Sequence, residues 1–411
     1  MDTQQFYQQL LGLEAPWEVI NVDLKLEDQR VDIEMLYNSK SVTCRCNKQC
    51  GIYDHSPRRS WRHLDTCQLV TYIHCRVPRS SCKTCKVKMI ETPWAEPHGH
   101  FTALFEQCAI DWLVLSQKQS LVAEKMQLSF DELHGIMKRA VRRGLNKRKL
   151  ENITSLSIDE KSMKKGHHYL TVLSDPKAGF ILDVCEHRTE EAVNSMFENT
   201  LTKEQRDKIE SVSMDMWKAF MSSANKKLKN ADIVHDRFHI SGYLLKAIDQ
   251  VRRQENTRLS KEGDESLKKS KYLFLRNEST IREKDKERFK KAIEASEKAA
   301  KVWKCKEVFR DFFELNFLQE GQNFINNWYI WAINEEITPL TKVANTIKNH
   351  TEGILNYIKH RCTNAFAESI NGRIQELKVN ARGFRHFDNY RSNILFYFGG
   401  LDLTLTPLKS L

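Results

Sequence analysis

The alternation of hydrophobic and polar positions divides the chain into three parts. Between residues 41 and 95, short segments around Trp61 and Val77 alternate with the period of two that is typical of strands. From Phe101 to about residue 149, hydrophobic positions recur every three or four residues, which predicts helices. After Asn152, short apolar segments are separated by turns and then by helical periods. The last part therefore reads as a mixed α/β domain.

The α/β part has a recognisable order of elements. The pattern predicts three strands, a helix, a strand, a helix and a strand, at residues 155–158, 169–173, 180–185, 189–201, 209–214, 216–228 and 231–235. An antiparallel meander followed by strand–helix units forms a mixed sheet with helices on its faces. This order matches the ribonuclease H-like fold, in which the first and fourth strands are neighbours.

Two aspartates follow these two strands directly, Asp159 after the first and Asp215 after the fourth. Neighbouring carboxylates repel each other unless cations lie between them. Two Mg²⁺ or Mn²⁺ ions about 4 Å apart are the arrangement that supports in-line phosphoryl displacement. Glu368, in an amphipathic helical segment at 363–378, is the candidate third ligand. For each acid the alternative is an ordinary surface carboxylate.

Between these acids, residues 240–310 are rich in Lys, Glu and Arg at helical spacing. Aromatic residues follow at 312–331. We expect an all-α insertion at about 240–350 whose charged positions face solvent and whose aromatic residues form its core. Stacking of these aromatic rings on nucleobases is the alternative.

Seven of the eleven cysteines lie between residues 44 and 85. Clustered cysteines in a chain without a secretory signal favour metal ligation over disulfides. The predicted Zn²⁺ ligands are Cys46, Cys50, Cys82 and Cys85, with Cys44 as a substitute in the first half-site. The segment between the two half-sites resembles a zinc ribbon. Reduced cysteines that pack as small hydrophobic residues are the alternative.

Two short helical segments at 121–126 and 130–141 are joined by a turn, and Ser129 with Glu132 forms a capping box at the start of the second. This predicts a helix-turn-helix whose second helix enters the major groove. A basic run suited to phosphates follows. The predicted DNA contacts are Lys138, Arg139, Arg142, Arg143, Lys147, Arg148 and Lys149, and near the C-terminus Arg373, Arg382 and Arg385. An ordinary helical hairpin with a basic linker is the alternative.

Composition narrows the class of protein. Of the net charge of +11, residues 41–150 carry 19 basic and 9 acidic groups, which favours a polyanionic partner over a merely solvated basic surface. Mean hydropathy is −0.57, and no apolar run approaches the ~18 residues that a membrane span needs. The N-terminus has no secretory-signal pattern. These features exclude a membrane protein and a secreted disulfide miniprotein.

Several sequence blocks resemble the insertion-sequence transposases of the bacterial ISL-three group. They occur in order along nearly the whole chain, at residues 61–65, 93–97, 158–161, 168–172, 215–217, 236–239, 251–255, 363–371 and 381–385. The resemblance implies a DDE transposase in which Asp159, Asp215 and Glu368 hold the metal ions. It also implies that Asp236 and His239 orient the site or the DNA. The first zinc half-site departs from the family pattern, because CRC stands where the family usually has CPxC.

The sequence therefore predicts a multidomain protein. Its expected parts are an N-terminal segment at 1–40, a zinc-binding domain at 41–95, a helix-turn-helix domain at 96–150, a ribonuclease H-like core at 151–398 and a tail at 399–411. The expected activity is metal-dependent cleavage and transfer of DNA strands at terminal inverted repeats, in a homodimer or larger synaptic complex. We expect a cytoplasmic, nucleoid-associated bacterial protein. A catalytically inactive DNA-binding regulator is the alternative.

Overall fold

The computed structural model describes residues 2–164, 168–361 and 365–405, apart from the side chains of 164, 168, 365 and 368. The chain divides into two compact units, which are described separately. The first unit contains the described residues of Met1–Arg148, Asn380–Gly383 and Leu401–Leu411. The second contains those of Lys149–Val379 and Phe384–Gly400.

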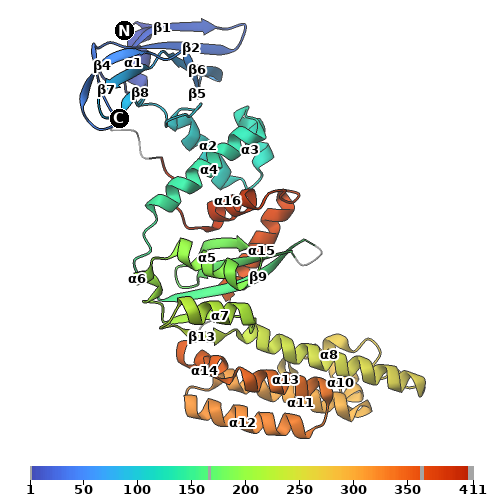
Figure 1. Ribbon diagram of the computed structural model, residues 1–411. Helices are drawn as coiled ribbons and strands as arrows, with labels where there is room; N and C mark the ends of the chain where they lie inside the picture. The colour runs from blue at the N-terminus through green and yellow to red at the C-terminus, as the bar shows by residue number, and fades with distance from the viewer. Residues whose placement is uncertain (1, 165–167, 362–364, 406–411) are drawn as a thin grey trace. The chain divides into compact units, whose positions relative to one another are not determined.

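Two four-stranded sheets and four helices build the first unit (Figure 1). The elements are α1 (Thr3–Leu10), β1 (Trp17–Lys25), β2 (Arg30–Tyr37), β3 (Ser41–Thr43), β4 (Gln49–His55), β5 (Arg59–Thr66), β6 (Leu69–Cys75), β7 (Pro78–Cys82), β8 (Lys86–Met89), α2 (Ala103–Leu115), α3 (Gln119–Met126) and α4 (Phe130–Lys147). The sheet orders are β1-β2-β6-β5 and β3-β4-β7-β8.

The first sheet departs from the predicted boundary at residue 40. β2 pairs in parallel with β6, so residues before 41 share a sheet with residues of the cysteine-rich segment. Val31, Ile33, Trp61 and Ile73 are all almost completely buried in one hydrophobic core. The burial of this shared face explains why residues 17–37 belong to the same folded body as residues 59–75.

The opposite face of this sheet is polar and is organised around Asp32. This largely buried carboxylate accepts hydrogen bonds from Arg30, from Lys25 at 2.9 Å and from Nε2 of His74 at 2.6 Å. Burial alone would raise the pKa of Asp32, but these three donors outweigh it and hold the pKa well below its usual range. Asp32 is therefore a charged structural centre.

We expect the substitution Asp32→Asn to lower the free energy of unfolding by about 2 kcal/mol at neutral pH, because three donors lose a charged acceptor. The folded-state pKa lies below the ordinary value of 3.8. The stabilisation is therefore complete above that value and is lost as the pH falls below it. Urea unfolding of wild type and variant at about pH 7 and about pH 3 measures this. Asp23→Asn is the control, since Asp23 is more exposed and contacts Lys25 at 3.5 Å; equal losses in both variants would contradict the expectation.

The second unit is built on a five-stranded sheet with the order β11-β10-β9-β12-β13. Its strands are β9 (Ser155–Lys164), β10 (His168–Asp175), β11 (Phe180–Glu186), β12 (Ser211–Met214) and β13 (Asp232–His235). β9, β10 and β11 form an antiparallel meander, whereas β12 runs parallel to both β9 and β13. This confirms the predicted order of elements and the adjacency of the first and fourth strands.

Helices cover both faces of this sheet (Figure 1). α5 (Glu190–Thr200) and α7 (Lys218–Lys227) bury Val193, Phe197 and Phe220 against the strands. The short α6 (Lys203–Arg206) lies between α5 and β12 in the chain. On the other face, α15 (Ala365–Asn380) lies along β9, and α16 (Phe387–Phe398) packs on β11.

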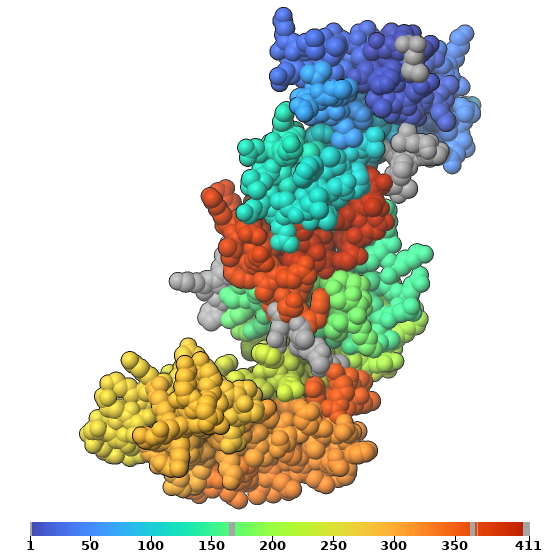
Figure 2. Space-filling view, turned by 180° about the vertical axis from the view of Figure 1, so that it is seen from behind, coloured from blue at the N-terminus to red at the C-terminus, as the bar shows by residue number. Residues whose placement is uncertain are grey.

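A helical body separates β13 from α15, as the charge pattern predicts. It consists of α8 (Arg237–Lys261), α9 (Lys271–Leu275), α10 (Glu283–Ala295), α11 (Glu297–Phe309), α12 (Leu318–Asn334), α13 (Thr338–Asn349) and α14 (Thr351–His360), with 3₁₀ turns at Glu278–Thr280 and Arg310–Glu314. Figure 2 shows the yellow and orange parts of this insertion packed together as one body. No helix in the described ranges has both the length and the apolar character that crossing a membrane requires.

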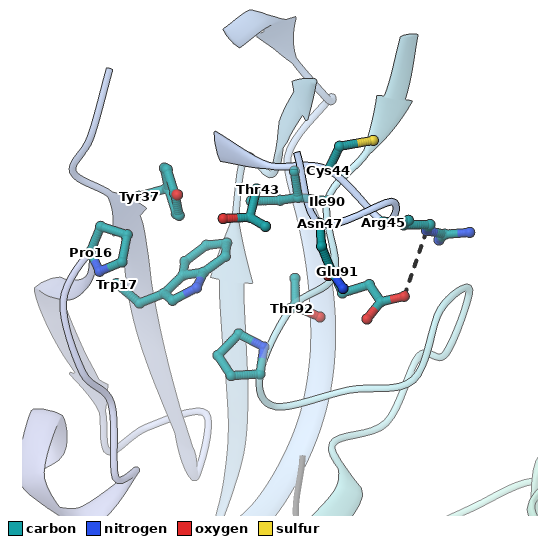
Figure 3. Close-up of a pocket in the computed structure, with 11 residues that line it drawn as sticks. Pro16, Trp17, Tyr37, Thr43, Cys44, Arg45, Asn47, Ile90, Glu91 and Thr92 are labelled. Carbon is teal, nitrogen blue, oxygen red and sulfur yellow. Dashed lines mark ion pairs between the residues drawn. The ribbon is translucent and has the colours of Figure 1, made fainter. Parts of the chain in front are cut away.

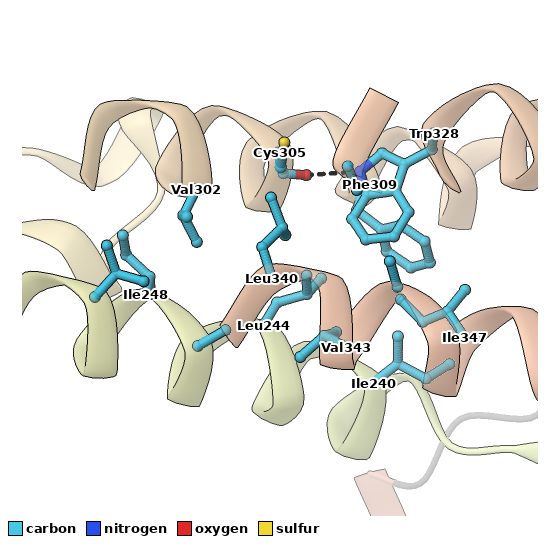
Figure 4. Packing of buried hydrophobic residues seen from close by; sticks show 14 of the residues in the cluster. Ile240, Leu244, Ile248, Val302, Cys305, Phe309, Trp328, Leu340, Val343 and Ile347 are labelled. Carbon is cyan, nitrogen blue, oxygen red and sulfur yellow. Dashed lines mark hydrogen bonds between the residues drawn. The ribbon is translucent and has the colours of Figure 1, made fainter. Parts of the chain in front are cut away.

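The aromatic residues of the insertion mostly form its core, in agreement with the prediction. Phe309 and Trp328 are buried with ring centroids 4.8 Å apart. The indole Nε1 of Trp328 donates to the carbonyl of Cys305 at 3.0 Å, so its polar atom is satisfied (Figure 4). Leu340 of α13 and Leu244 of α8 close this core. Phe317 is an exception, because it is largely exposed.

Candidate functional site

Three aspartates lie at the same level on three adjacent strands: Asp159 within β9, which continues beyond the predicted end at residue 158, and Asp215 and Asp236 directly after β12 and β13. In the β9–β12–β13 register, Ser157 is opposite Ser213, which is opposite Val234. Two residues beyond each of these positions lie Asp159, Asp215 and Asp236. Because side chains alternate between faces with a period of two, the register directs all three carboxylates to the same face. The candidate site therefore lies at the carboxyl ends of parallel strands, where α/β sheets commonly bind ligands.

The two central strands carry the same alternation, SLSID in β9 and SVSMD in β12. Their hydrophobic residues, such as Ile158 and Met214, are buried beneath α5 and α7. Their small serines face the other way and let the strands and helices approach closely, with the hydroxyls of Ser155 and Ser211 3.1 Å apart. This repeated pattern places both aspartates on the face opposite the hydrophobic core.

His239 joins the three carboxylates. It lies in the first turn of α8, which Asp236 caps by accepting from the amide of Phe238 at 2.9 Å. Its Nδ1 is 3.7 Å from Asp215, and its Nε2 is 3.9 Å from Asp159 and 3.8 Å from Asp236. The structure thus brings Asp159, Asp215, Asp236 and His239 together.

α15 reaches the same site through Asn371. The side-chain amide of Asn371 donates to Asp159, and Nζ of Lys161 donates to the carbonyl of Asn371. Glu368 lies one helical turn before Asn371 on α15, but its side chain is outside the described residues. Asn371 and Lys161 were not among the predicted site residues.

The donor set fits divalent cations. Burial raises the pKa of Asp159, and the Glu160 amide, His239 and Asn371 act in the opposite direction. A buried carboxylate of this kind favours a positive partner. Hard oxygen ligands are those that Mg²⁺ and Mn²⁺ prefer.

A second candidate metal site is formed by two turns of the first unit. Cys44 and Cys46 lie in the turn between β3 and β4, and Cys82 and Cys85 lie at the turn between β7 and β8. The four sulfur atoms lie within 4.8 Å of one another. The amide of Cys85 donates to Sγ of Cys82 at 3.4 Å. Backbone amides of Cys85 and Thr84 lower the pKa of the Cys82 thiol to about 6, which favours the thiolate that binds metal.

In the first half-site Cys46 is joined by Cys44 and not by Cys50. Cys44 is the substitute ligand that the sequence offered. Cys50 lies on β4 opposite the buried Val42 and packs against the hydrophobic core. The turn brings Cys44 inward instead, since the Cys44 amide donates to the carbonyl of Lys48 and Asn47 adopts a φ of 61°. The spacing of the cysteines suggested Cys50 as a ligand. β4 begins at Gln49, however, so Cys50 lies in the strand and not in the turn.

A cavity of about 350 Å³ adjoins the turn that carries Cys44 (Figure 3). Trp17 and Tyr37, which come from β1 and β2, line it with ring centroids 4.8 Å apart. Arg45 and Glu91 form an ion pair of 3.7 Å at its other side. Trp17 and Tyr37, which precede position 41, therefore line a cavity next to the turn that carries Cys44.

The predicted DNA-contacting residues of α4 fall into two classes. Arg139 and Arg143 form ion pairs with the buried Glu106, and Arg143 also contacts Glu96 at 3.0 Å. These two arginines join α4 to α2 and to the preceding loop. Lys138 and Arg142 are exposed on α4.

The remaining basic residues differ in their surroundings. Lys147 bonds to the carbonyl of Thr404 at 2.7 Å and to Asp402 at 3.3 Å. The guanidinium of Arg373 lies over the ring of Phe398. Arg148 is partly buried, whereas Lys149, Arg382 and Arg385 are exposed.

Comparison with known proteins identifies the family. Residues 156–394 match the DDE transposase family of the ISL3 group, and residues 42–85 match the zinc finger of the transposases of IS204, IS1001, IS1096 and IS1165. The chain belongs to the ISL3 transposase family. The predicted ISL-three resemblance and the zinc-ribbon domain are thereby confirmed, and the four thiols lie within or at the end of the matched zinc-finger segment.

Two curated relatives of this transposase cover most of its length. The transposase for insertion sequence element IS1557 of Mycobacterium tuberculosis is 25% identical over 367 residues, which cover 83% of this chain and 82% of the relative. The transposase for insertion sequence element IS1001 of Bordetella parapertussis is 24% identical over 367 residues, which cover 88% of this chain and 90% of the relative.

Proposed function

We propose that this transposase has a ribonuclease H-like core and cleaves and joins DNA strands at the terminal inverted repeats of an insertion sequence. The observation that carries the proposal is the convergence of Asp159, Asp215 and Asp236 on one face around His239. Asn371 links this group to the helix that carries Glu368. The adjacency of β9 and β12, which brings Asp159 and Asp215 to one face, supports the proposal.

In this proposal Asp159, Asp215 and Glu368 hold two Mg²⁺ or Mn²⁺ ions. Bound there, the ions would supply an activated oxygen nucleophile and stabilise the leaving oxygen. Asn371 and the amide of Glu160 orient Asp159, the latter at 2.8 Å. His239 and Asp236 fix the entry of α8 beside the carboxylates. Catalysis would rest mainly on positioning and on neutralisation of charge.

The cleavage experiment uses the full chain with a duplex that contains the element's end. Wild type should nick this duplex with Mg²⁺ or Mn²⁺, and the exposed 3′-hydroxyl should then join to target DNA. A duplex with a scrambled end is the control for recognition. Specific binding of the end without any nicking under either ion would favour a catalytically inactive regulator and overturn the enzymatic proposal.

The first unit would bind the inverted repeat, with Zn²⁺ held by the four thiols and α4 in the major groove. A synaptic dimer is part of the proposal, because two element ends must be held together for joining.

The two classes of basic residue on α4 give a direct prediction for this binding. Lys138→Ala and Arg142→Ala should each weaken binding to any duplex and reduce the slope of log affinity against log salt by about 0.9, as expected for one lost phosphate contact. Arg139→Ala should instead lower thermal stability and leave the slope unchanged, since Arg139 pairs with the buried Glu106. Anisotropy titrations at several salt concentrations measure the slopes. A reduced slope for Arg139→Ala alone would contradict the assignment.

A further inference from the structure

Near the carboxyl ends of the strands, the guanidinium of Arg188 lies over two aromatic rings. Cζ of Arg188 lies 4.0 Å from the ring centroid of Tyr169 and 4.1 Å from that of Trp217. Nη1 of Arg188 also donates to both carboxylate oxygens of Glu160, at 2.9 and 3.2 Å. The indole Nε1 of Trp217 donates to the backbone carbonyl of Arg188 at 3.2 Å. Three other segments of the fold thus hold the loop and the side chain of Arg188.

This cation is held by residues that neighbour the candidate site in the chain, on the face of the sheet that carries α5 and α7. Glu160 follows Asp159 directly, and Trp217 is two residues after Asp215. The sequence analysis did not single out Arg188, because the loop after β11 carries no pattern of its own. Its contacts with Glu160, Tyr169 and Trp217 arise only when the strands come together in the fold.

Half of the guanidinium remains available. The hydrogen bonds to Glu160 use Nη1, and neither Nε nor Nη2 of Arg188 makes a hydrogen bond within the described part of the chain. The Arg188 side chain is 27% exposed, and Trp217 is 39% exposed. A planar fork with free donors, already ordered by its neighbours, loses little entropy when it binds an oxyanion.

The unbonded edge of the guanidinium can reduce the electrostatic repulsion between the carboxylates and DNA. A DNA strand that reaches the site must bring its phosphates towards Asp159, Asp215, Asp236 and Glu160, which repel them. A fixed cation at the rim offsets this repulsion, and the exposed face of Trp217 is suited to a neighbouring base.

We propose that Arg188 binds a DNA phosphate adjacent to the scissile phosphate, with Tyr169 and Trp217 holding the guanidinium in place. The inference rests on the proposed function of the carboxylate site. It adds a binding subsite for the phosphate backbone and a residue that sets the position of the strand during cleavage.

The test combines Arg188 variants of the full chain with methylphosphonates, which remove the charge of one phosphate at a time. Binding of the end-containing duplex is measured with Ca²⁺, so that affinity is read without cleavage. Arg188→Ala should weaken binding about tenfold and reduce the salt slope by about 0.9. A methylphosphonate at the contacted position should weaken wild type about tenfold and leave Arg188→Ala unchanged. Arg188→Lys should keep the salt slope but not the full affinity, because it retains the charge and loses the planar fork.

Arg253→Ala is the matched control, because Arg253 is 67% exposed on α8 and pairs with Asp249. It should lose the same affinity as wild type at every methylphosphonate position. If Arg188→Ala unfolds, Arg188→Gln carries the same comparison, because it keeps a long polar side chain and loses the charge. If every methylphosphonate near the cleaved bond weakens Arg188→Ala as much as it weakens wild type, the proposal is overturned. Arg188, Tyr169 and Trp217 would then have a structural role only. Binding without cleavage by wild type would overturn the proposed function instead, since the phosphate comparison is measured in binding.

Discussion

Replacing Asp159 by asparagine should reduce DNA strand cleavage by about 10³-fold or more, because the site loses a charged oxygen ligand on β9. Asp215→Asn should have an effect of the same order, since Asp215 directly follows β12 at the level of Asp159 on β9. The two substitutions together should cost little more than either alone, because residues that act as a unit are non-additive. Rates are measured on the end-containing duplex with Mg²⁺.

The control for these variants is Asp311→Asn, which removes an exposed carboxylate of the insertion. It should cleave at the wild-type rate. Asp159→Asn should remain folded, because it keeps its shape and loses a charge whose burial is unfavourable. Cleavage by a folded Asp159→Asn within about threefold of wild type would show that this carboxylate has no part in the chemistry.

The second large effect concerns the four thiols. Cys82→Ser should abolish binding of Zn²⁺ and unfold the β3-β4-β7-β8 sheet, because a structural zinc contributes about 10 kcal/mol or more to folding. Cys44→Ser should do the same, whereas Cys50→Ser should keep the metal. Zinc content by elemental analysis and thermal unfolding measure these outcomes.

Cys67→Ser is the control, since Cys67 is exposed and is not part of the thiol group. It should keep full zinc content and stability. Loss of zinc in Cys50→Ser with retention in Cys44→Ser would reverse the assignment and restore the ligand set that the spacing alone suggested.

Local sequence patterns predicted those parts of the fold that depend on neighbours in the chain. Hydrophobic and polar residues alternate strictly in the strands around Ile158 and Val212. The face of the sheet that each side chain takes was therefore predictable, and so was the shared face of Asp159 and Asp215. The capping box at Ser129 and Glu132 forms as predicted. In each case a few consecutive residues contain the whole signal.

Contacts between distant segments could not be predicted in this way. The pairing of β2 with β6 joins residues some forty positions apart, and nothing local indicates it. The choice of Cys44 over Cys50 depends on where β4 begins. Arg139 resembles any other residue of a basic run until Glu106 is placed beside it. Arg188 likewise acquires a role only from the strands that surround it.

The most direct measurement of the central claim is the position of Mn²⁺ in crystals of the full chain bound to end-containing DNA, located by anomalous scattering. The account predicts two Mn²⁺ peaks within coordination distance of Asp159, Asp215 and Glu368, and their loss in Asp159→Asn. Ordered DNA in the site without Mn²⁺ between Asp159 and Asp215 would contradict it.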